Sequence, residues 1–308
     1  MALVDYSSSS AAESDTDDEP QQRPANRCQH GGANSEKDIN GAPESAMPPL
    51  PPAFHDLYAS SVRHSVVDDP SLHQGRKRQN PHVPGTWPSH VYVEWHPTKA
   101  QHDTLDELVG LVEAELGDDV TLHNFLTSDL GAQLPLHISL SRPLSLPTAE
   151  KDAFLEKLTH AMRRSGTEAF AVRPNGLAWH RSPDSDRTFL VLRVATSGRP
   201  DDAAPPNAEL VALLTRCNAV AALFGQPALY QGNRGTAVGT AFHVSIGWTF
   251  GLPGEEASLR VRGLFERTQF QAVRAWEIGV SGVKAKIGNV VSHISLATGA
   301  GKASLYEQ

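Results

Sequence analysis

The sequence contains little cysteine: Cys28 and Cys217 are the only two in 308 residues. Cys28 falls in a polar amino-terminal stretch, so we expect no structural disulfide framework, which suits a reducing compartment. The chain also has no apolar run long enough to cross a membrane, and its first residues do not resemble a signal peptide. These absences predict a protein with no disulfide scaffold and no membrane association.

Motifs for several common chemistries are missing as well. There is no HExxH, no paired CxxC and no DxDxDG, so nothing in the sequence favours a metal site. There is also no GxSxG elbow of a Ser-His-Asp hydrolase and no glycine-rich phosphate loop. We therefore expect no metal and no cofactor, and the remaining candidates for chemistry are histidine and serine side chains.

Negative charge is concentrated at the amino terminus. Residues 1–52 hold nine Asp/Glu and three Lys/Arg, so they account for −6 of the formal net charge of −8. A polar, acidic segment of this kind cannot bury enough apolar surface to offset its ordering entropy, and we expect disorder over 1–74. We expect one folded domain over 75–300 and a short tail over 301–308. Because the folded domain is nearly neutral, an anionic ligand must be recognised locally.

Apolar periodicity in the folded part alternates between strands and helices. Strands are expected at 90–95, 134–141, 169–180, 188–197, 241–250, 275–288 and 290–297. Helices are expected at 104–117, 148–166 and 207–225, and a mobile loop at 231–240. Asp103 or Thr104 is expected to cap the first helix, and Gly117 to end it. This order of elements predicts an α+β fold with antiparallel sheets.

Two stretches place a histidine and a serine two residues apart within an apolar alternation. In the strand LPLHISL, His137 and Ser139 share one face, and in AFHVSIGW, His243, Ser245 and Gly247 share one face. The two histidines are 106 residues apart, and each follows a segment that contains a predicted helix. This spacing is expected of two similar lobes that each supply one strand to a shared cleft.

Two imidazoles and two hydroxyls that face one cavity fit phosphodiester chemistry. A histidine pKa is ordinarily near 6.5, so one ring can take a proton from an attacking hydroxyl while the other gives a proton to the leaving oxygen. Ser139 and Ser245 can donate hydrogen bonds to phosphate oxygens, and Gly247 would let the backbone approach the phosphate. This chemistry needs no metal, and which of His137 and His243 is the base stays open.

A single His-x-Ser in a strand is more often a satisfied polar pair than a catalytic one. Catalysis is favoured here because the motif occurs twice, 106 residues apart, a spacing that fits one copy in each of two similar lobes. A third match, VSHISLA, contains His293 and Ser295 but lies only 50 residues after His243. That spacing is too short for another lobe with its own helix, so we interpret this polar pair as structural.

These features resemble a known family. Tandem His-x-Ser strands are typical of the two-histidine (2H) phosphoesterases. Five stretches are similar to the U6 small nuclear RNA phosphodiesterase family: GRKRQNPHVPGTWPSHVYVEW, LPLHISLSRP, DRTFLVLRV, AFHVSIGW and VKAKIGN. The resemblance covers about residues 75–297. It implies a two-lobed 2H phosphoesterase-like fold, with antiparallel sheets that form a central cleft and helices packed outside.

The resemblance implies a metal-independent 3′-to-5′ exoribonuclease of the nucleus. It would act as a monomer on single-stranded RNA and trim the 3′ oligouridine tail of U6 RNA. The resemblance makes His137 and His243 the catalytic pair, and Ser139 and Ser245 the phosphate-binding hydroxyls. Tyr230 resembles an aromatic residue before the second motif that stacks on a base; plain packing is the alternative for a tyrosine near a helix exit.

The implied mechanism is attack of the penultimate 2′-hydroxyl on the last phosphate, which releases the terminal nucleoside and leaves a 2′,3′-cyclic phosphate. Some relatives then open this ring to a monophosphate. Two alternatives stay open. One is another 2H phosphodiesterase, acting on cyclic nucleotides or tRNA ends. The other is a non-catalytic RNA-binding splicing module whose histidines only contact phosphate.

Overall fold

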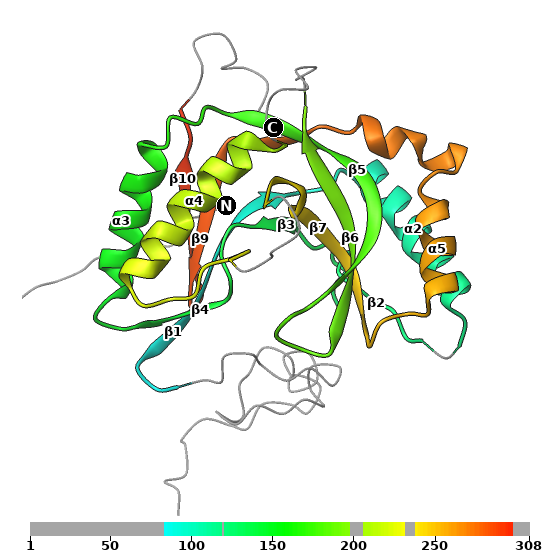
Figure 1. Cartoon of the computed structure of the whole chain (residues 1–308), viewed down its shortest axis with the longest axis horizontal. Helices are drawn as coiled ribbons and strands as arrows, with labels where there is room; N and C mark the ends of the chain where they lie inside the picture. The colour runs from blue at the N-terminus through cyan, green and yellow to red at the C-terminus, as the bar shows by residue number, and fades with distance from the viewer. Residues whose placement is uncertain (1–82, 119, 198–205, 232–237, 298–308) are drawn as a thin grey trace, which may run out of the picture. The chain divides into compact units, whose positions relative to one another are not determined.

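The structure is a computed structural model, and it describes residues 83–118, 120–197, 206–231 and 238–297 (Figure 1). The tails predicted over 1–74 and 301–308 lie outside the described residues, as does most of the loop predicted over 231–240. The limits predicted for the folded domain therefore stay predictions.

The described residues form a ten-stranded sheet with helices packed against it. The strands are β1 (Thr86–Trp95), β2 (His123–Asn124), β3 (Leu136–Ser139), β4 (Leu144–Pro147), β5 (Phe170–Arg181), β6 (Arg187–Thr196), β7 (His243–Phe250), β8 (Ile278–Val280), β9 (Gly282–Ile287) and β10 (Val290–Ser295). The helices are α2 (Lys99–Leu116), α3 (Lys151–Arg163), α4 (Ala208–Leu223) and α5 (Glu255–Leu264), with 3-10 segments η2 (Val238–Thr240) and η3 (Thr268–Ala275). No helix in the described ranges is both long and apolar enough to span a membrane.

The predicted α+β fold with antiparallel pairing is confirmed. The strand order is β10-β9-β1-β3-β7-β6-β5-β8. In addition, β2 pairs with β7, and β4 pairs with β1. Every pairing between these strands is antiparallel. Figure 1 shows α3 and α4 on one side of the sheet's centre and α2 and α5 on the other. α3 contacts α4, β9 and β10, whereas α5 contacts α2 and β5. The two motif-bearing strands, β3 and β7, are direct neighbours between these helix pairs.

Alternation in the central strands separates a buried face from a polar one. On β1, Val91 and Val93 are buried in the apolar core, whereas His90, Tyr92 and Glu94 between and beside them are partly exposed. β3 follows the same alternation, and β7 begins with it, so the histidine and serine of both motifs avoid the core. The buried side chains pack the sheet against the helices, and the polar side chains lie on the other face, where they can contact a ligand.

Helix α2 starts earlier than predicted. Thr98 Oγ1 accepts a hydrogen bond from Gln101 N at 3.3 Å, and Gln101 Oε1 accepts one from Thr98 N at 2.9 Å. This reciprocal capping box satisfies two backbone donors and starts the helix directly after Thr98. The prediction that Asp103 or Thr104 caps this helix is therefore wrong, whereas Gly117 ends it as predicted.

Helix α5 and segment η3 were not predicted from the sequence. Of the ten residues of α5, only Val261 and Leu264 are buried, which is too few to produce a recognisable helical period. Its amino-terminal cap is Gly254, which has no side chain that could accept a hydrogen bond from the first turn. Tertiary contacts with α2 and β5, rather than a local signal, therefore account for this helix.

Thr98→Ala is expected to lower the free energy of unfolding by about 1 kcal/mol, because it removes the side-chain acceptor of the capping box. Urea titration followed by circular dichroism measures this change. Thr104→Ala is the matched control, since the Thr104 hydroxyl donates only to the Ala100 carbonyl one turn earlier in the same helix. An equal loss in both variants would show that the capping box contributes nothing specific.

Candidate active site

β3 and β7 bring the two His-x-Ser motifs side by side. Ile138 on β3 is the partner of Val244 on β7 in an antiparallel register. Because neighbouring residues alternate between faces, the residues that flank this pair meet on the opposite face of the sheet. The pairs that this register sets across from each other are His137 with Ser245 and Ser139 with His243.

His137 and His243 are diagonal neighbours in this arrangement. Diagonal positions on adjacent antiparallel strands are about 7–8 Å apart, and their Cβ atoms are somewhat closer. That separation leaves room for a phosphate between two imidazoles. The charge of His137 is also one of the influences that lower the pKa of His243, as expected of rings within electrostatic reach.

His137 is exposed and is bordered by side chains of β1. Its ring contacts His90 and Tyr92 edge-on, with ring centroids 5.2 Å and 5.5 Å away. Glu94 is its partner in the β1–β3 register. Desolvation by the surrounding protein lowers the pKa of His137, and the Glu94 carboxylate opposes this by attracting the charged form.

The Glu94 carboxylate is held between the side chains of Lys284 and His96. Lys284 Nζ forms an ion pair with Glu94 Oε2, and His96 Nε2 lies 2.6 Å from the same oxygen. Burial alone would raise the pKa of Glu94, but the hydrogen bonds to Lys284 and His96 lower it overall. Glu94 is therefore ionised at neutral pH and places a negative charge beside His137.

His243 is held by the backbone in one orientation. Its Nδ1 lies 2.7 Å from the carbonyl oxygen of Ala241. A carbonyl oxygen only accepts hydrogen bonds, so Nδ1 carries the hydrogen. The neutral ring consequently has its lone pair on Nε2. His243 is therefore set up to accept a proton at Nε2.

The surroundings of His243 favour its neutral form. Burial is the main cause that lowers its pKa to about 4, and the ring of His180 and the guanidinium of Arg193 act in the same direction. The His180 ring centroid is 4.7 Å from that of His243, and Arg193 is the partner of His243 in the β6–β7 register. The two central histidines thus differ: His137 has a carboxylate beside it, and His243 has a guanidinium.

Known proteins resemble this chain along most of its length. A family model named HVSL and described as an uncharacterised conserved protein matches residues 48–295. U6 snRNA phosphodiesterase 1 of Neurospora crassa is 40% identical over 276 residues, which cover 82% of this chain and 75% of that protein. The chain belongs to the U6 snRNA phosphodiesterase family.

Membership of the U6 snRNA phosphodiesterase family confirms the resemblance inferred from the five sequence stretches. The family's protein from Mus musculus is 24% identical over 261 residues, covering 85% of this chain and 83% of that protein. A solved structure of Kluyveromyces marxianus Usb1 with uridine monophosphate matches with 18% identity and a TM-score of 0.49, covering 68% of this chain and 98% of that chain. The match of the family model begins at residue 48, upstream of residue 75, where the resemblance was predicted to begin.

For this U6 snRNA phosphodiesterase family member, the structure adds site residues that the motifs did not contain. They are His90, Tyr92 and Glu94 on β1, His180 on β5 and Arg193 on β6. Arg193 Nη1 also donates a hydrogen bond to the Thr240 carbonyl at 2.8 Å, which holds the guanidinium near the start of β7. The polar positions of HVYVEW were a signal for the β1 residues, but only the strand order places them beside His137.

A β-bulge lies within the second motif. The β6–β7 register shifts between Ser245 and Gly247, so Ile246 has no partner on β6. Gly247 is buried, and a Cβ at this position would lie 3.1 Å from the backbone oxygen of His123 on β2. The close approach of β2 is therefore a reason for glycine here, and a contact between Gly247 and phosphate stays a prediction.

Tyr230 packs against the segment that enters β7. Its hydroxyl donates a hydrogen bond to the Ala241 carbonyl at 3.2 Å, and its ring meets Phe242 edge-on with centroids 5.8 Å apart. Burial raises the pKa of Tyr230 above its usual value. Tyr230 thus lies beside the second motif with a packing role, and its stacking on a base stays a prediction.

His293, from the third His-x-Ser match, lies at the edge of the sheet. It is exposed on β10, and its strand partner is Lys284 on β9. Three strand-to-strand steps separate β10 from β3, a distance of about 14 Å at 4.7–4.9 Å a step. At this distance His293 cannot contact the same phosphorus as His137 and His243, in keeping with a structural interpretation.

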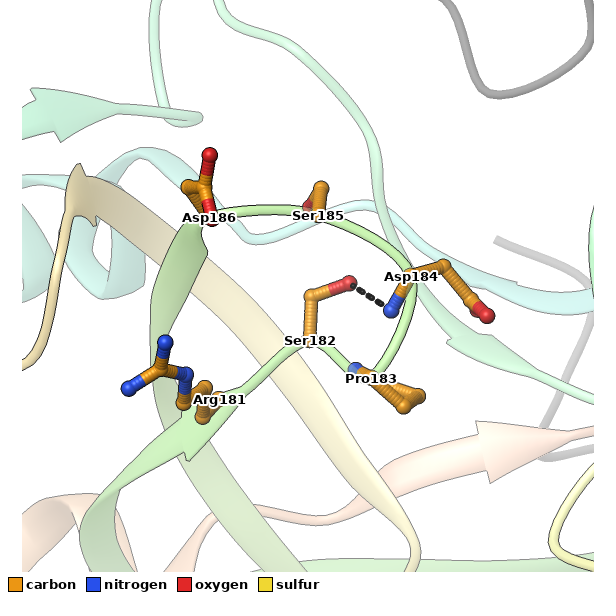
Figure 2. Close-up of a pocket in the computed structure, with 6 residues that line it drawn as sticks. All are labelled: Arg181, Ser182, Pro183, Asp184, Ser185 and Asp186. Carbon is orange, nitrogen blue, oxygen red and sulfur yellow. Dashed lines mark hydrogen bonds between the residues drawn. The ribbon is translucent and has the colours of Figure 1, made fainter.

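A pocket at the β5–β6 turn is separate from the motif residues. Figure 2 shows its lining residues, 181–186, around the turn, with Ser182 Oγ accepting a hydrogen bond from Asp184 N. An ion pair between Arg142 and Asp184 ties this turn to the chain that follows β3. Within the described ranges, no group of three or more His, Cys, Asp or Glu is placed to hold a metal ion. Independence from metal stays a prediction.

Proposed function

We propose that this chain is a phosphodiesterase that removes nucleotides from the 3′ end of U6 snRNA. The observation that carries the proposal is the β3–β7 register, which sets His137 and His243 at diagonal positions on one face of the sheet. The proteins named U6 snRNA phosphodiesterase 1 support the choice of substrate. Nuclear action, specificity for a 3′ oligouridine end and a monomeric state belong to the same proposal.

His243 is the general base and His137 the general acid. The bond from Nδ1 to the Ala241 carbonyl leaves the lone pair of His243 on Nε2, and Arg193 and His180 disfavour a second proton. Burial lowers the pKa of His137 as well, but the Glu94 carboxylate beside this ring opposes the shift and favours the protonated form. The active form is therefore the one in which His243 is neutral and His137 carries the proton.

The reaction is an internal transesterification. The 2′-hydroxyl of the penultimate nucleotide forms a bond to the last phosphorus while its proton passes to Nε2 of His243. The bond from phosphorus to the 5′-oxygen of the terminal nucleoside breaks, and that oxygen takes a proton from His137. The products are a free nucleoside and an RNA ending in a 2′,3′-cyclic phosphate.

Ser139 and Ser245 hold the phosphate during this reaction. Each serine faces the histidine of the other motif across the β3–β7 pair, so the four side chains surround one site. Their hydroxyls donate to the non-bridging oxygens and hold the phosphorus in line between base and acid. Tyr230 contributes near the start of β7 by stacking on a base, and Gly247 contributes farther along the strand by close backbone approach.

A single gel experiment tests the proposal. Uridine-ended and adenosine-ended RNAs are incubated with the protein, with and without EDTA, and the product end is tested with phosphatase before and after acid treatment. We expect stepwise shortening of the uridine-ended RNA, no effect of EDTA, and an end that resists phosphatase until acid opens the ring. If the protein shortened neither the uridine-ended nor the adenosine-ended RNA, the proposed function would be refuted.

The pH dependence of kcat/KM is expected to be bell-shaped, because activity needs His243 neutral and His137 protonated. Activity falls at low pH as His243 becomes protonated, and at high pH as His137 loses its proton. Glu94→Gln removes the carboxylate that raises the pKa of His137, so the alkaline limb should move to lower pH while the acidic limb stays in place. Stopped-assay rates from about pH 3 to pH 9, a range that extends below the His243 pKa of about 4 and above an ordinary histidine pKa, measure this.

Glu156→Gln is the matched control for this experiment, since Glu156 is an exposed carboxylate on α3. Its pH profile should match that of the wild type. If Glu94→Gln moved the acidic limb instead, His137 would be the base and the two roles would be exchanged.

A further inference from the structure

We propose that Lys286, together with the stacked rings of His90 and Tyr92, binds the RNA on the 5′ side of the scissile phosphate. The proposal rests on the proposed function, because it assigns a place to the part of the substrate that the enzyme retains. It names a binding surface on β1 and β9, which we call the β1–β9 surface and define as His90, Tyr92, Lys284 and Lys286.

The β1–β9 surface continues the catalytic face of the sheet. Tyr92 on β1 is the partner of Ser139 on β3 and, on its other side, of Lys284 on β9. His90 is the partner of Lys286 in the same β1–β9 register. Directly opposite residues in a sheet point to the same side, so these side chains extend the face of the two motifs toward β9.

His90 and Tyr92 form a stacking platform beside His137. Their rings are stacked, with centroids 5.3 Å apart and planes 25° apart, and both side chains are partly exposed. Each also touches the His137 ring edge-on, so the platform begins at the reacting phosphate. Stacking of a base on an aromatic ring is tolerant of sequence, because every base has a π-face. A burial-lowered pKa of about 3 keeps His90 neutral, so it offers a ring rather than a charge.

Lys286 supplies the positive charge of the β1–β9 surface. Lys284 is already neutralised by its ion pair with Glu94. Lys286 is exposed, and no carboxylate of the described part of the chain lies within ion-pair distance of its Nζ. Because the folded domain is nearly neutral overall, a cation without a bound carboxylate on the catalytic face is a local site for a phosphate.

The chemistry of the substrate indicates which part of the RNA lies on the β1–β9 surface. In the first cleavage the leaving nucleoside ends in hydroxyls, so no phosphate follows it on the 3′ side of the scissile bond. The retained RNA carries one phosphate for each nucleotide on the 5′ side. On the opposite side of the motifs, the guanidinium of Arg193 faces His243 and is bound to the Thr240 carbonyl, which suits the scissile phosphate itself. We therefore assign Lys286 on β9 to the side of the site that holds the retained RNA.

The distances fit this assignment. β9 is two strand-to-strand steps from β3, which is about 10 Å at the usual strand spacing. A flexible lysine side chain reaches back across part of that span. Lys286 is thus placed to contact a phosphate one or two nucleotides upstream of the scissile bond, with the intervening base on Tyr92 or His90.

Substrate length tests the proposal. UpU contains the scissile phosphate and no upstream phosphate, whereas a uridine pentamer with a 5′-hydroxyl contains three upstream phosphates. Lys286→Ala should lower kcat/KM for the pentamer by about fivefold to tenfold and leave UpU cleavage within about twofold of wild type, as expected for one lost phosphate contact. The slope of log(kcat/KM) against log[KCl] for the pentamer should become shallower by about 1.

Two further measurements keep the result unambiguous. Lys157→Ala removes an exposed lysine of α3 and should change neither substrate. Fluorescence anisotropy with a pentamer that is 2′-deoxy at the penultimate position should show weaker binding to Lys286→Ala by the same factor as the kinetic loss. Equal losses on UpU and pentamer, or no loss on the pentamer, would overturn the proposal. Wild-type protein that cleaves neither RNA would instead refute the proposed function on which it rests.

Discussion

His243→Ala and His137→Ala will each lower kcat for trimming of uridine-ended RNA by at least about 10²–10⁴-fold, the usual contribution of one general acid or base. The expectation follows from the β3–β7 register, which sets both rings on one face of the sheet, where the proposed mechanism places the phosphate between them. Single-turnover rates with a 3′-labelled RNA measure the chemical step directly. Binding of the RNA should change much less than the rate, because Ser139 and Ser245 remain.

His293→Ala is the matched control for these variants. His293 belongs to the same type of motif and is exposed, but it lies on the edge strand β10 beside Lys284. Its replacement should leave the rate within about twofold of wild type, as for most surface substitutions. An equal loss in His293→Ala would mean that the catalytic pair had been assigned wrongly. Full trimming activity in the His137→Ala/His243→Ala double variant would instead mean that neither histidine takes part in the cleavage.

A substrate with a better leaving group separates the two roles. In an RNA whose last bridging 5′-oxygen is replaced by sulfur, the leaving thiolate needs little protonation, since a thiol is far more acidic than an alcohol. His137→Ala should then regain most of its lost rate, whereas His243→Ala should not, because the 2′-hydroxyl still needs its base. Rescue of His243→Ala alone would exchange the assignments.

The motifs themselves were predictable because they depend on a local property. In a strand, alternate residues face opposite sides, so LHIS and HVS each set a histidine and a serine on one face without any knowledge of the fold. The structure places His137 and His243 on neighbouring strands, as the hypothesis of a shared site requires. Their mutual register was not predictable, since a pairing between residues so far apart depends on the whole sheet.

The electrostatic difference between the histidines could not be predicted for the same reason. Glu94 affects His137, and Arg193 affects His243, only because β1 pairs with β3 and β6 with β7. The bulge at Ile246 was equally hidden, because its sequence reads as an uninterrupted alternation. Sequence alone therefore identifies candidate groups, while the assignment of base and acid depends on neighbours that long-range pairing supplies.

A uridine-ended RNA with a single 2′-deoxy nucleotide at the penultimate position will bind the protein and stay uncut. The attacking group is missing from this substrate, so the rate should fall by at least about 10⁴-fold, in line with the advantage of a well-placed intramolecular nucleophile. Its affinity should weaken by no more than about tenfold, the cost of one lost hydrogen bond. Competition against trimming of all-ribose RNA measures its binding, and single-turnover assays measure its cleavage.

The matched control moves the same deletion by one nucleotide. A 2′-deoxy residue at the 3′ terminal position removes a hydroxyl from the leaving nucleoside and leaves the nucleophile in place, so cleavage should continue near the normal rate. Normal cleavage of the penultimate 2′-deoxy RNA, with a linear phosphate or a hydroxyl at the new end, would mean that water attacks the phosphorus. In that case Nε2 of His243 would activate water rather than a ribose hydroxyl. The two placements of one missing oxygen therefore distinguish an RNA-specific transesterase from a hydrolase that tolerates DNA.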